Sequence, residues 1–166
     1  MKHLVSISIF LCAVVIAGLW TSCDKTTCDP AECIGNNMGC NLGRCGCIQG
    51  YEGPNCDSYS YEKFIGNYNV SETCTTGTGA RNSFLYNMYI SNTSRIDVIT
   101  ITNIHQYATV EATINNSNLV ISNQSNGASS YEGQGEYFGT QRQLKLQYQY
   151  FQGSQSEQCT AIMTKL

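Results

Sequence analysis

Ten cysteines are the residues of this 166-residue chain with the clearest capacity for chemistry. Six of them follow one another in the order Cys28-x4-Cys33-x6-Cys40-x4-Cys45-x-Cys47-x8-Cys56. A segment this short buries too little apolar area to fold unaided, so metal ions or disulfides must supply the missing stability. Zinc sites prefer Cys-x2-Cys pairs, and the segment contains none. The spacing therefore favours disulfides.

Outside the cysteines, few residues suggest a catalytic site. His105 lies in a predicted turn, where we expect a solvated side chain, and a Ser/His/Asp set cannot be assembled from His105 and Asp97. Glu132 and Glu136 share one face of a predicted strand. Such a pair could hydrolyse glycosides, but exposed strand glutamates are the simpler interpretation. We expect no catalytic residue, no metal site and no cofactor, and the residues that bind a ligand stay unknown.

The N-terminal residues predict export. Leu4 to Leu19 is almost wholly apolar but short for a permanent membrane span. Thr21-Ser22-Cys23 resembles the lipobox of bacterial lipoproteins, which implies a signal peptide at 1–22, lipidation of Cys23 and a linker at 23–27. The alternative is an ordinary disulfide cysteine after a cleaved secretory signal. The expected location is the cell envelope or cell surface, at the outer membrane of a Gram-negative bacterium, with secretion as the alternative.

The end of the cysteine segment has a specific pattern. Cys45, Cys47, Gly50, Tyr51, Gly53 and Cys56 give Cys-x-Cys-x2-Gly-Tyr-x-Gly-x2-Cys. Six cysteines alone permit fifteen connectivities. The pattern resembles an epidermal-growth-factor-like (EGF-like) domain of the compact tenascin type, covering residues 28–57. That resemblance implies the bridges Cys28–Cys40, Cys33–Cys45 and Cys47–Cys56. Calcium binding is not expected, because only Asp24 offers a carboxylate before Cys28.

Residues 58–166 predict short antiparallel strands separated by Asn, Ser, Gly and Thr clusters. In Gln143 to Tyr150 polar and apolar residues alternate, so the even-numbered side chains should face the core. Ala108, Val110, Ala112 and Ile114 should be buried likewise, and Tyr68, Val70 and Tyr89 should also point inward. The expected strands are Asn67–Cys74, Leu85–Asn92, Asp97–Asn103, Ala108–Ile114, Asn118–Asn123, Tyr131–Phe138, Gln143–Tyr150 and Glu157–Lys165.

The expected fold is all-β, with an antiparallel up-and-down barrel of about eight strands after the cysteine-rich module. Closing the sheet removes both of its edges. Closure makes the first and last strands neighbours, so a Cys74–Cys159 disulfide should lock them together. Gly133 and Gly135 fit a bend at a barrel corner. Phe64, Gly66 and Tyr68 resemble the Phe-x-Gly-x-Trp/Tyr opening of lipocalins, which implies a lipocalin-like domain at 58–166.

Composition narrows the function. The net charge of -3 and the scattered Lys and Arg residues argue against nucleic-acid binding. We predict a lipid-anchored, non-catalytic binding or interaction protein, with the EGF-like module as a stalk and the barrel as the contact domain for a protein or glycan. One alternative is a carrier that holds a small apolar ligand inside the barrel. A second is a secreted hydrolase that uses Glu132 and Glu136.

Overall fold

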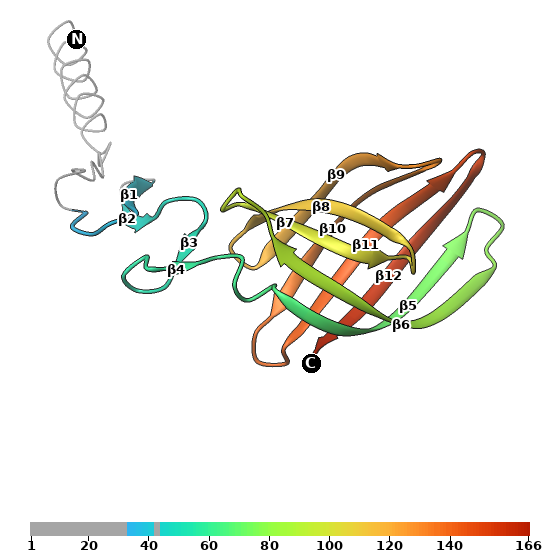
Figure 1. The fold of residues 1–166 in the computed structure, drawn as a ribbon, viewed down its shortest axis with the longest axis horizontal. Helices are drawn as coiled ribbons and strands as arrows, with labels where there is room; N and C mark the ends of the chain where they lie inside the picture. Colours follow the sequence, from blue (N-terminus) through green and yellow to red (C-terminus); the bar gives the residue numbers. More distant parts are fainter. Residues whose placement is uncertain (1–32, 42–43) are drawn as a thin grey trace, which may run out of the picture.

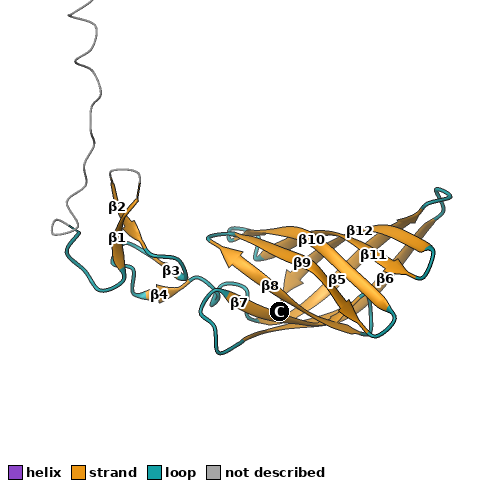
Figure 2. Ribbon diagram, turned by 90° about the horizontal axis from the view of Figure 1, so that it is seen from above, coloured by secondary structure: helices purple, strands orange, loops and turns teal. Residues whose placement is uncertain are grey.

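The computed structural model describes residues 33–41 and 44–166, and within these ranges the protein contains strands and no helix (Figures 1 and 2). A small N-terminal module of four short strands precedes a closed barrel of eight strands. The predicted leader at 1–22, Cys23 and Cys28 lie outside the described residues. No helix in the part of the chain that the structure describes has the length and apolar character of a membrane-spanning segment.

The barrel is a pure up-and-down meander. Each strand pairs antiparallel with the next, and the last strand pairs with the first, which closes the sheet. This confirms the all-β, eight-stranded barrel predicted from the sequence. The strands are β5 (Gly66–Thr76), β6 (Arg81–Asn92), β7 (Val98–Ile104), β8 (Ala108–Asn115), β9 (Asn118–Asn126), β10 (Ser129–Phe138), β11 (Gln143–Gln152) and β12 (Gln155–Lys165).

The β5–β12 seam holds the barrel closed. Nine consecutive residue pairs run along it, from Glu157 opposite Thr76 to Lys165 opposite Tyr68. Cys74 and Cys159 lie directly opposite each other in this ladder and form a disulfide. The bridge expected from the positions of these two cysteines is therefore present.

Alternation of side chains decides what fills the barrel, because successive residues of a strand face opposite sides of a sheet. β8 follows the pattern buried–exposed without interruption. The even-numbered residues of β11 from Leu144 to Tyr150 are all buried. The inward position predicted for Tyr89 is wrong. Its side chain is 45% exposed, and its neighbours Met88 and Ile90 are buried instead, because the inward side chains of β6 carry even numbers.

Large side chains occupy the interior. Phe64, just before β5, is fully buried, and the hydroxyl of Tyr68 donates a hydrogen bond of 2.6 Å to its carbonyl oxygen. The buried cluster that spans the barrel also includes Val70, Met88, Ile90, Ile99, Ile101, Ile104, Val110, Ile114, Leu119, Ile121, Tyr131, Leu144, Leu146, Tyr148, Tyr150 and Met163. The interior is thus a packed core over most of its length.

Disulfides cross-link the N-terminal module. Its strands are β1 (Met38–Asn41), β2 (Arg44–Cys47), β3 (Tyr51–Glu52) and β4 (Ser58–Tyr59). The bridges Cys33–Cys45 and Cys47–Cys56 are present, as the sequence resemblance implied. The expected Cys28–Cys40 bridge includes a residue outside the described ranges. Gly50 and Gly53 have φ values of +91° and +92°, a backbone conformation that favours glycine.

The module lies against the end of the barrel that carries the β6–β7 loop (Figure 1). The amide of Gln49 donates to Asp97 at 3.5 Å, and the side chain of Ile96 packs beside Gly50. Lys63 forms an ion pair with Glu52 of the module. We call the opposite end, with the β5–β6, β7–β8, β9–β10 and β11–β12 turns, the distal end.

Candidate functional site

A carboxylate lies inside the barrel, where an apolar side chain would be expected. Glu72 is on β5, and its side chain has no exposure to solvent. It shares the inward face of the strand with Tyr68, Val70 and Cys74, because all four positions have the same parity. A buried charged group without partners is costly, so the groups that contact Glu72 define the site.

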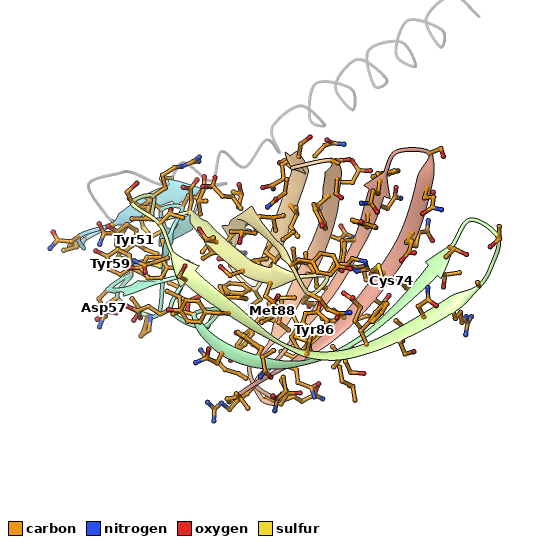
Figure 3. The ribbon with its side chains drawn as sticks, turned by 45° about the vertical axis from the view of Figure 1, so that its right-hand side comes forward. Tyr51, Asp57, Tyr59, Cys74, Tyr86 and Met88 are labelled. Carbon is orange, nitrogen blue, oxygen red and sulfur yellow. A yellow bond between two sulfur atoms is a disulfide. The ribbon has the colours of Figure 1, made fainter. Side chains whose placement is uncertain are left out.

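Two tyrosines bind one oxygen of this carboxylate. The hydroxyl of Tyr86, on β6, donates a hydrogen bond of 3.0 Å to Glu72 Oε1. The hydroxyl of Tyr148, on β11, donates to the same oxygen. The backbone N–H of His105 donates to the Tyr86 hydroxyl at 3.1 Å. These contacts join β5, β6, β11 and the β7–β8 turn through one polar centre, and the side chain of Tyr86 is marked in Figure 3.

His105 binds the other oxygen. Its Nδ1 lies 3.1 Å from Glu72 Oε2 and 3.3 Å from the Tyr148 hydroxyl. Only 5% of the residue is exposed, so the expectation of a solvated turn histidine is wrong. The physical reason is the shape of the turn, in which Asn103, His105 and Gln106 have φ values of 70°, 49° and 73°. These left-handed conformations are uncommon for non-glycine residues, and in this turn the imidazole faces the interior.

Aromatic rings surround the imidazole. The ring centroid of Tyr150 lies 4.5 Å from that of His105, and those of Phe84 and Tyr107 lie 5.7 and 5.8 Å away. Tyr131 packs on Tyr150 at 5.3 Å. The rings exclude water from the pair formed by Glu72 and His105, which strengthens the electrostatic interactions within it.

Burial fixes the protonation of the tyrosines that contact Glu72. Loss of solvent contact raises the pKa of Tyr148, and the negative charge of Glu72 raises it further. The same two causes, in the same order, raise the pKa of Tyr86. Burial also raises the pKa of Tyr131, to about 12. The two hydroxyls that donate to Glu72 therefore keep their protons at neutral pH and remain hydrogen-bond donors.

The seam disulfide borders this cluster. Cys74 Sγ lies 3.8 Å from His105 Nδ1. Metal-ligating atoms of Glu72, Cys74, His105 and Cys159 all lie within 4.8 Å of one another, and all four residues are buried. As a disulfide, the two sulfurs do not offer the thiolates that bind metals. In its oxidised form the cluster is thus a buried hydrogen-bond network beside a covalent bridge.

A further carboxylate lies two residues along β12 from Cys159. Glu157 pairs with Thr76 across the seam and with Tyr150 on the other side. Its Oε2 is buried and has no hydrogen-bond partner. An unsatisfied carboxylate oxygen is uncommon in a folded protein.

The carboxylates considered in the sequence lie elsewhere. Glu132 and Glu136 project from the outer face of β10, where Glu132 is half-buried and Glu136 exposed. Asp97 lies at the module end of the barrel and binds Arg95 at 3.3 Å. His105 is in a distal turn, so the structure does not bring it together with Asp97.

Two shallow depressions adjoin each other on the outer face of β9 to β12. The larger has a volume of about 410 Å³, and the smaller about 310 Å³. Val120, Gln134 and Gln147 line both. We call the combined surface the outer groove. Its other outward-facing polar residues are Glu132, Gln149, Gln158 and Thr160 in the larger depression, and Asn118, Glu136 and Lys145 in the smaller one.

Sequence reasoning missed the buried cluster, although one signal was available. Glu72 has the parity of Tyr68 and Val70, which were predicted to point inward, so the alternation also placed a carboxylate inside the barrel. An ionisable group at a core position is a functional-site candidate. The position of His105 had no comparable signal, because it depends on the conformation of a turn.

Comparisons with known proteins do not extend this description. The chain matches no protein-family model and no curated protein sequence. Its functional assignment therefore rests on the geometry of its own residues.

Proposed function

We propose that this protein is a lipid-anchored, extracytoplasmic binding protein without catalytic activity, whose outer groove binds a neutral oligosaccharide. Cys23 carries the lipid, and an EGF-like module spaces the barrel from the membrane. Disulfides persist in oxidising compartments outside the cytoplasm, and the three bridges of the structure support export. The outer groove is the observation that carries the proposal.

The lining of the outer groove favours a ligand rich in hydroxyl groups. Side-chain amides dominate the larger depression, through Gln134, Gln147, Gln149 and Gln158. Each amide offers both donors and an acceptor, which suits neighbouring sugar hydroxyls. Phe138, 37% exposed at the smaller depression, adds an aromatic surface. Carboxylates and a single lysine provide no strong positive field for an anionic ligand.

The packed interior supports surface contact over the carrier alternative. Tyr68, Val70, Ile114 and Tyr148 all belong to the buried core cluster. Their side chains occupy the space that a ligand inside the barrel would need. A carrier needs an enclosed apolar cavity of several hundred cubic ångströms. The two depressions of the outer groove lie outside the barrel wall.

The spacing of the glutamates supports binding over hydrolysis. Glu132 and Glu136 are four residues apart on one strand, which separates their backbones by about 13 Å at about 3.3 Å per residue. Glycosidase carboxylates lie about 5–9.5 Å apart on opposite sides of the scissile bond. Two carboxylates on one strand face do not meet that requirement.

Binding to a panel of neutral glycans tests the groove. The purified full-length protein should bind at least one of them, and Gln134→Ala with Gln147→Ala should weaken that binding roughly 10- to 100-fold, for about two lost hydrogen bonds. Gln155→Ala, at the exposed first residue of β12 and outside the groove, is the matched control and should bind normally. Equal binding by the double variant, or a protein partner cross-linked in the groove with no glycan bound, would contradict the proposal.

Two separate measurements test the anchor and the module. Radioactive palmitate should label the wild-type protein in cells but not the Cys23→Ala variant, and label on the variant would contradict lipidation at Cys23. Peptide mapping by mass spectrometry under non-reducing conditions should find Cys28 linked to Cys40. A different partner for Cys28 would contradict the EGF-like pairing.

A further inference from the structure

Four metal-ligating side chains from three different parts of the barrel meet at its distal end. Glu72 and Cys74 lie on β5, His105 in the β7–β8 turn and Cys159 on β12. Their ligand atoms lie within 4.8 Å of one another, and every one of the residues is buried. Two sulfurs, one imidazole nitrogen and one carboxylate oxygen form a donor set that suits tetrahedral Zn²⁺.

The contacts already approach the spacing of such a site. Zn²⁺ binds thiolates at about 2.3 Å and nitrogen or oxygen at about 2.0–2.2 Å, so neighbouring ligand atoms of a tetrahedron lie about 3.3–3.8 Å apart. His105 Nδ1 lies 3.1 Å from Glu72 Oε2 and 3.8 Å from Cys74 Sγ. The two sulfurs must separate, which breaking the disulfide permits, and the ligand atoms that now lie up to 4.8 Å apart must move closer together.

The surrounding residues resemble the outer shell of a metal centre. Tyr86 and Tyr148 donate hydrogen bonds to the other oxygen of Glu72, which orients its carboxylate. Tyr86 also accepts the backbone N–H of His105 and so holds the turn in place. Partners of this kind commonly fix metal ligands and tune their affinity.

A second observation also points to a cation at this end. The buried Oε2 of Glu157 lacks a hydrogen-bond partner, and Glu157 lies on the same face of β12 as Cys159. Glu157 is not one of the four clustered residues, so a cation bound by them would act on its carboxylate only through charge and not as a ligand. The disulfide has no such effect, because it is neutral.

We propose that reduction of the Cys74–Cys159 disulfide converts the distal end of the barrel into a buried Zn²⁺ site formed by Glu72, Cys74, His105 and Cys159. The disulfide accepts two electrons and two protons from a small dithiol, which itself becomes a cyclic disulfide and which reaches the buried sulfurs when the seam opens. Zn²⁺ then displaces the two thiol protons, which pass to water, and binds the sulfurs as thiolates. The seam is thus held by a covalent bridge in one redox state and by a metal ion in the other.

Zinc binding by the full-length chain tests this directly. After anaerobic reduction and removal of the reductant, the wild-type protein should bind one more Zn²⁺ per chain than the Cys74→Ser/Cys159→Ser variant treated identically, measured by competition with a chromophoric chelator. The comparison subtracts zinc held by other reduced cysteines, which both chains share. Cys47→Ser/Cys56→Ser is the matched control. It removes two cysteines of the module and should keep the Zn²⁺ bound at Cys74 and Cys159. Equal zinc content in the wild type and the Cys74→Ser/Cys159→Ser variant would overturn the proposal.

Co²⁺ reports the identity of the ligands. The reduced wild type should show thiolate-to-cobalt charge transfer and the strong visible bands of tetrahedral Co²⁺, and both should be absent from the oxidised protein. Tyr86→Phe should lower the Co²⁺ affinity about 10- to 100-fold. His105→Gln removes a ligand and should lower that affinity further. Equal spectra from oxidised and reduced protein, or a His105→Gln variant with wild-type affinity, would contradict the site.

Alkylation mapping uses only the wild-type chain, so it does not depend on whether a variant folds. Zn²⁺ should protect Cys74 and Cys159 of the reduced protein from iodoacetamide, as mapped by peptide mass spectrometry. Protection confined to the cysteines of the N-terminal module would overturn the proposal.

Discussion

Gly133 on β10 lies directly opposite Tyr148 on β11, and the missing side chain of the glycine is what allows the two strands to meet there. A Cβ at Gly133 would come within 2.5 Å of both Gln147 O and Tyr148 Cβ. The β9–β10 pairing also shifts register between Tyr131 and Gly133. The sequence predicted a bend at this glycine, and the register shift lies there. The residue opposite it, Tyr148, is the one whose hydroxyl binds Glu72.

Replacing this glycine should therefore destabilise the barrel. The atoms that Gly133→Ala would meet include backbone, which cannot move without shifting β11, so we expect a loss of about 1–3 kcal/mol in the free energy of unfolding. Chemical denaturation measures it. Gly77→Ala, where a Cβ would meet nothing within 4 Å, should leave stability nearly unchanged. Equal stability of the two variants would contradict the close approach at Gly133.

Loss of the Glu72 carboxylate should be costly because three groups depend on it. Glu72→Leu leaves Tyr86, Tyr148 and His105 without their common acceptor, and we expect a loss of about 3–5 kcal/mol. Adding Tyr86→Phe and Tyr148→Phe removes the two hydroxyls that lost their acceptor. Each change should restore about 1–3 kcal/mol of the free energy of unfolding. Denaturant titration of the series measures the network.

The outer surface provides a control for that series. Glu111 is an exposed strand glutamate on β8, and Glu111→Leu should change stability by no more than about 0.5 kcal/mol. If Glu72→Leu were equally mild, Glu72 would not be the centre of a buried network.

Strong alkali should unfold the protein through its buried tyrosines. The pKa of Tyr131 is raised to about 12, and burial raises the pKa of Tyr68, Tyr86 and Tyr148 as well. Because the folded pKa values exceed the unfolded value near 10, stability is complete below about pH 10 and falls as pH rises above it. Each such tyrosine contributes up to about 1.4 kcal/mol per pH unit.

Tyrosinate absorbance followed together with circular dichroism tests this behaviour. Tyrosines in contact with solvent should ionise first, while the fold is intact. The buried ones should ionise only in a second step that coincides with loss of the β-sheet signal. Ionisation of all tyrosines in one step, with the fold retained, would show that they are accessible to solvent.

Removal of the seam disulfide should destabilise the barrel more than removal of a disulfide of the module does. Cys74–Cys159 joins residues separated by 85 positions, and a loop of that size corresponds to about 4–5 kcal/mol in the chain-entropy account. Cys74→Ala/Cys159→Ala should lower the barrel's thermal midpoint accordingly under metal-free, oxidising conditions. Cys47→Ala/Cys56→Ala should leave the barrel transition in place, and a larger effect of that pair would contradict this ranking.

The strands could be predicted because their signal is local. Alternation along β8 and β11 depends only on residue type, and it placed Ala108 to Ile114 and Leu144 to Tyr150 correctly. Tyr89 was misplaced because one aromatic residue in a strand of mixed polarity does not define parity. The position of the His105 ring depends on left-handed turn residues without glycine. The outer groove forms where four strands curve together, which no single segment encodes.

The β5–β12 seam has a consequence for the order in which the domain assembles. Every other strand pair joins neighbours in sequence, so seven hairpins can form while the chain is still emerging. The seam needs the last strand, and the closing contacts reach to Leu166, whose N–H donates to Asn67 O at 2.9 Å. Contacts of such large sequence separation are slow to form. The barrel is therefore an open sheet with two unpaired edges until its final residues arrive, and that interval is when it is most prone to aggregation.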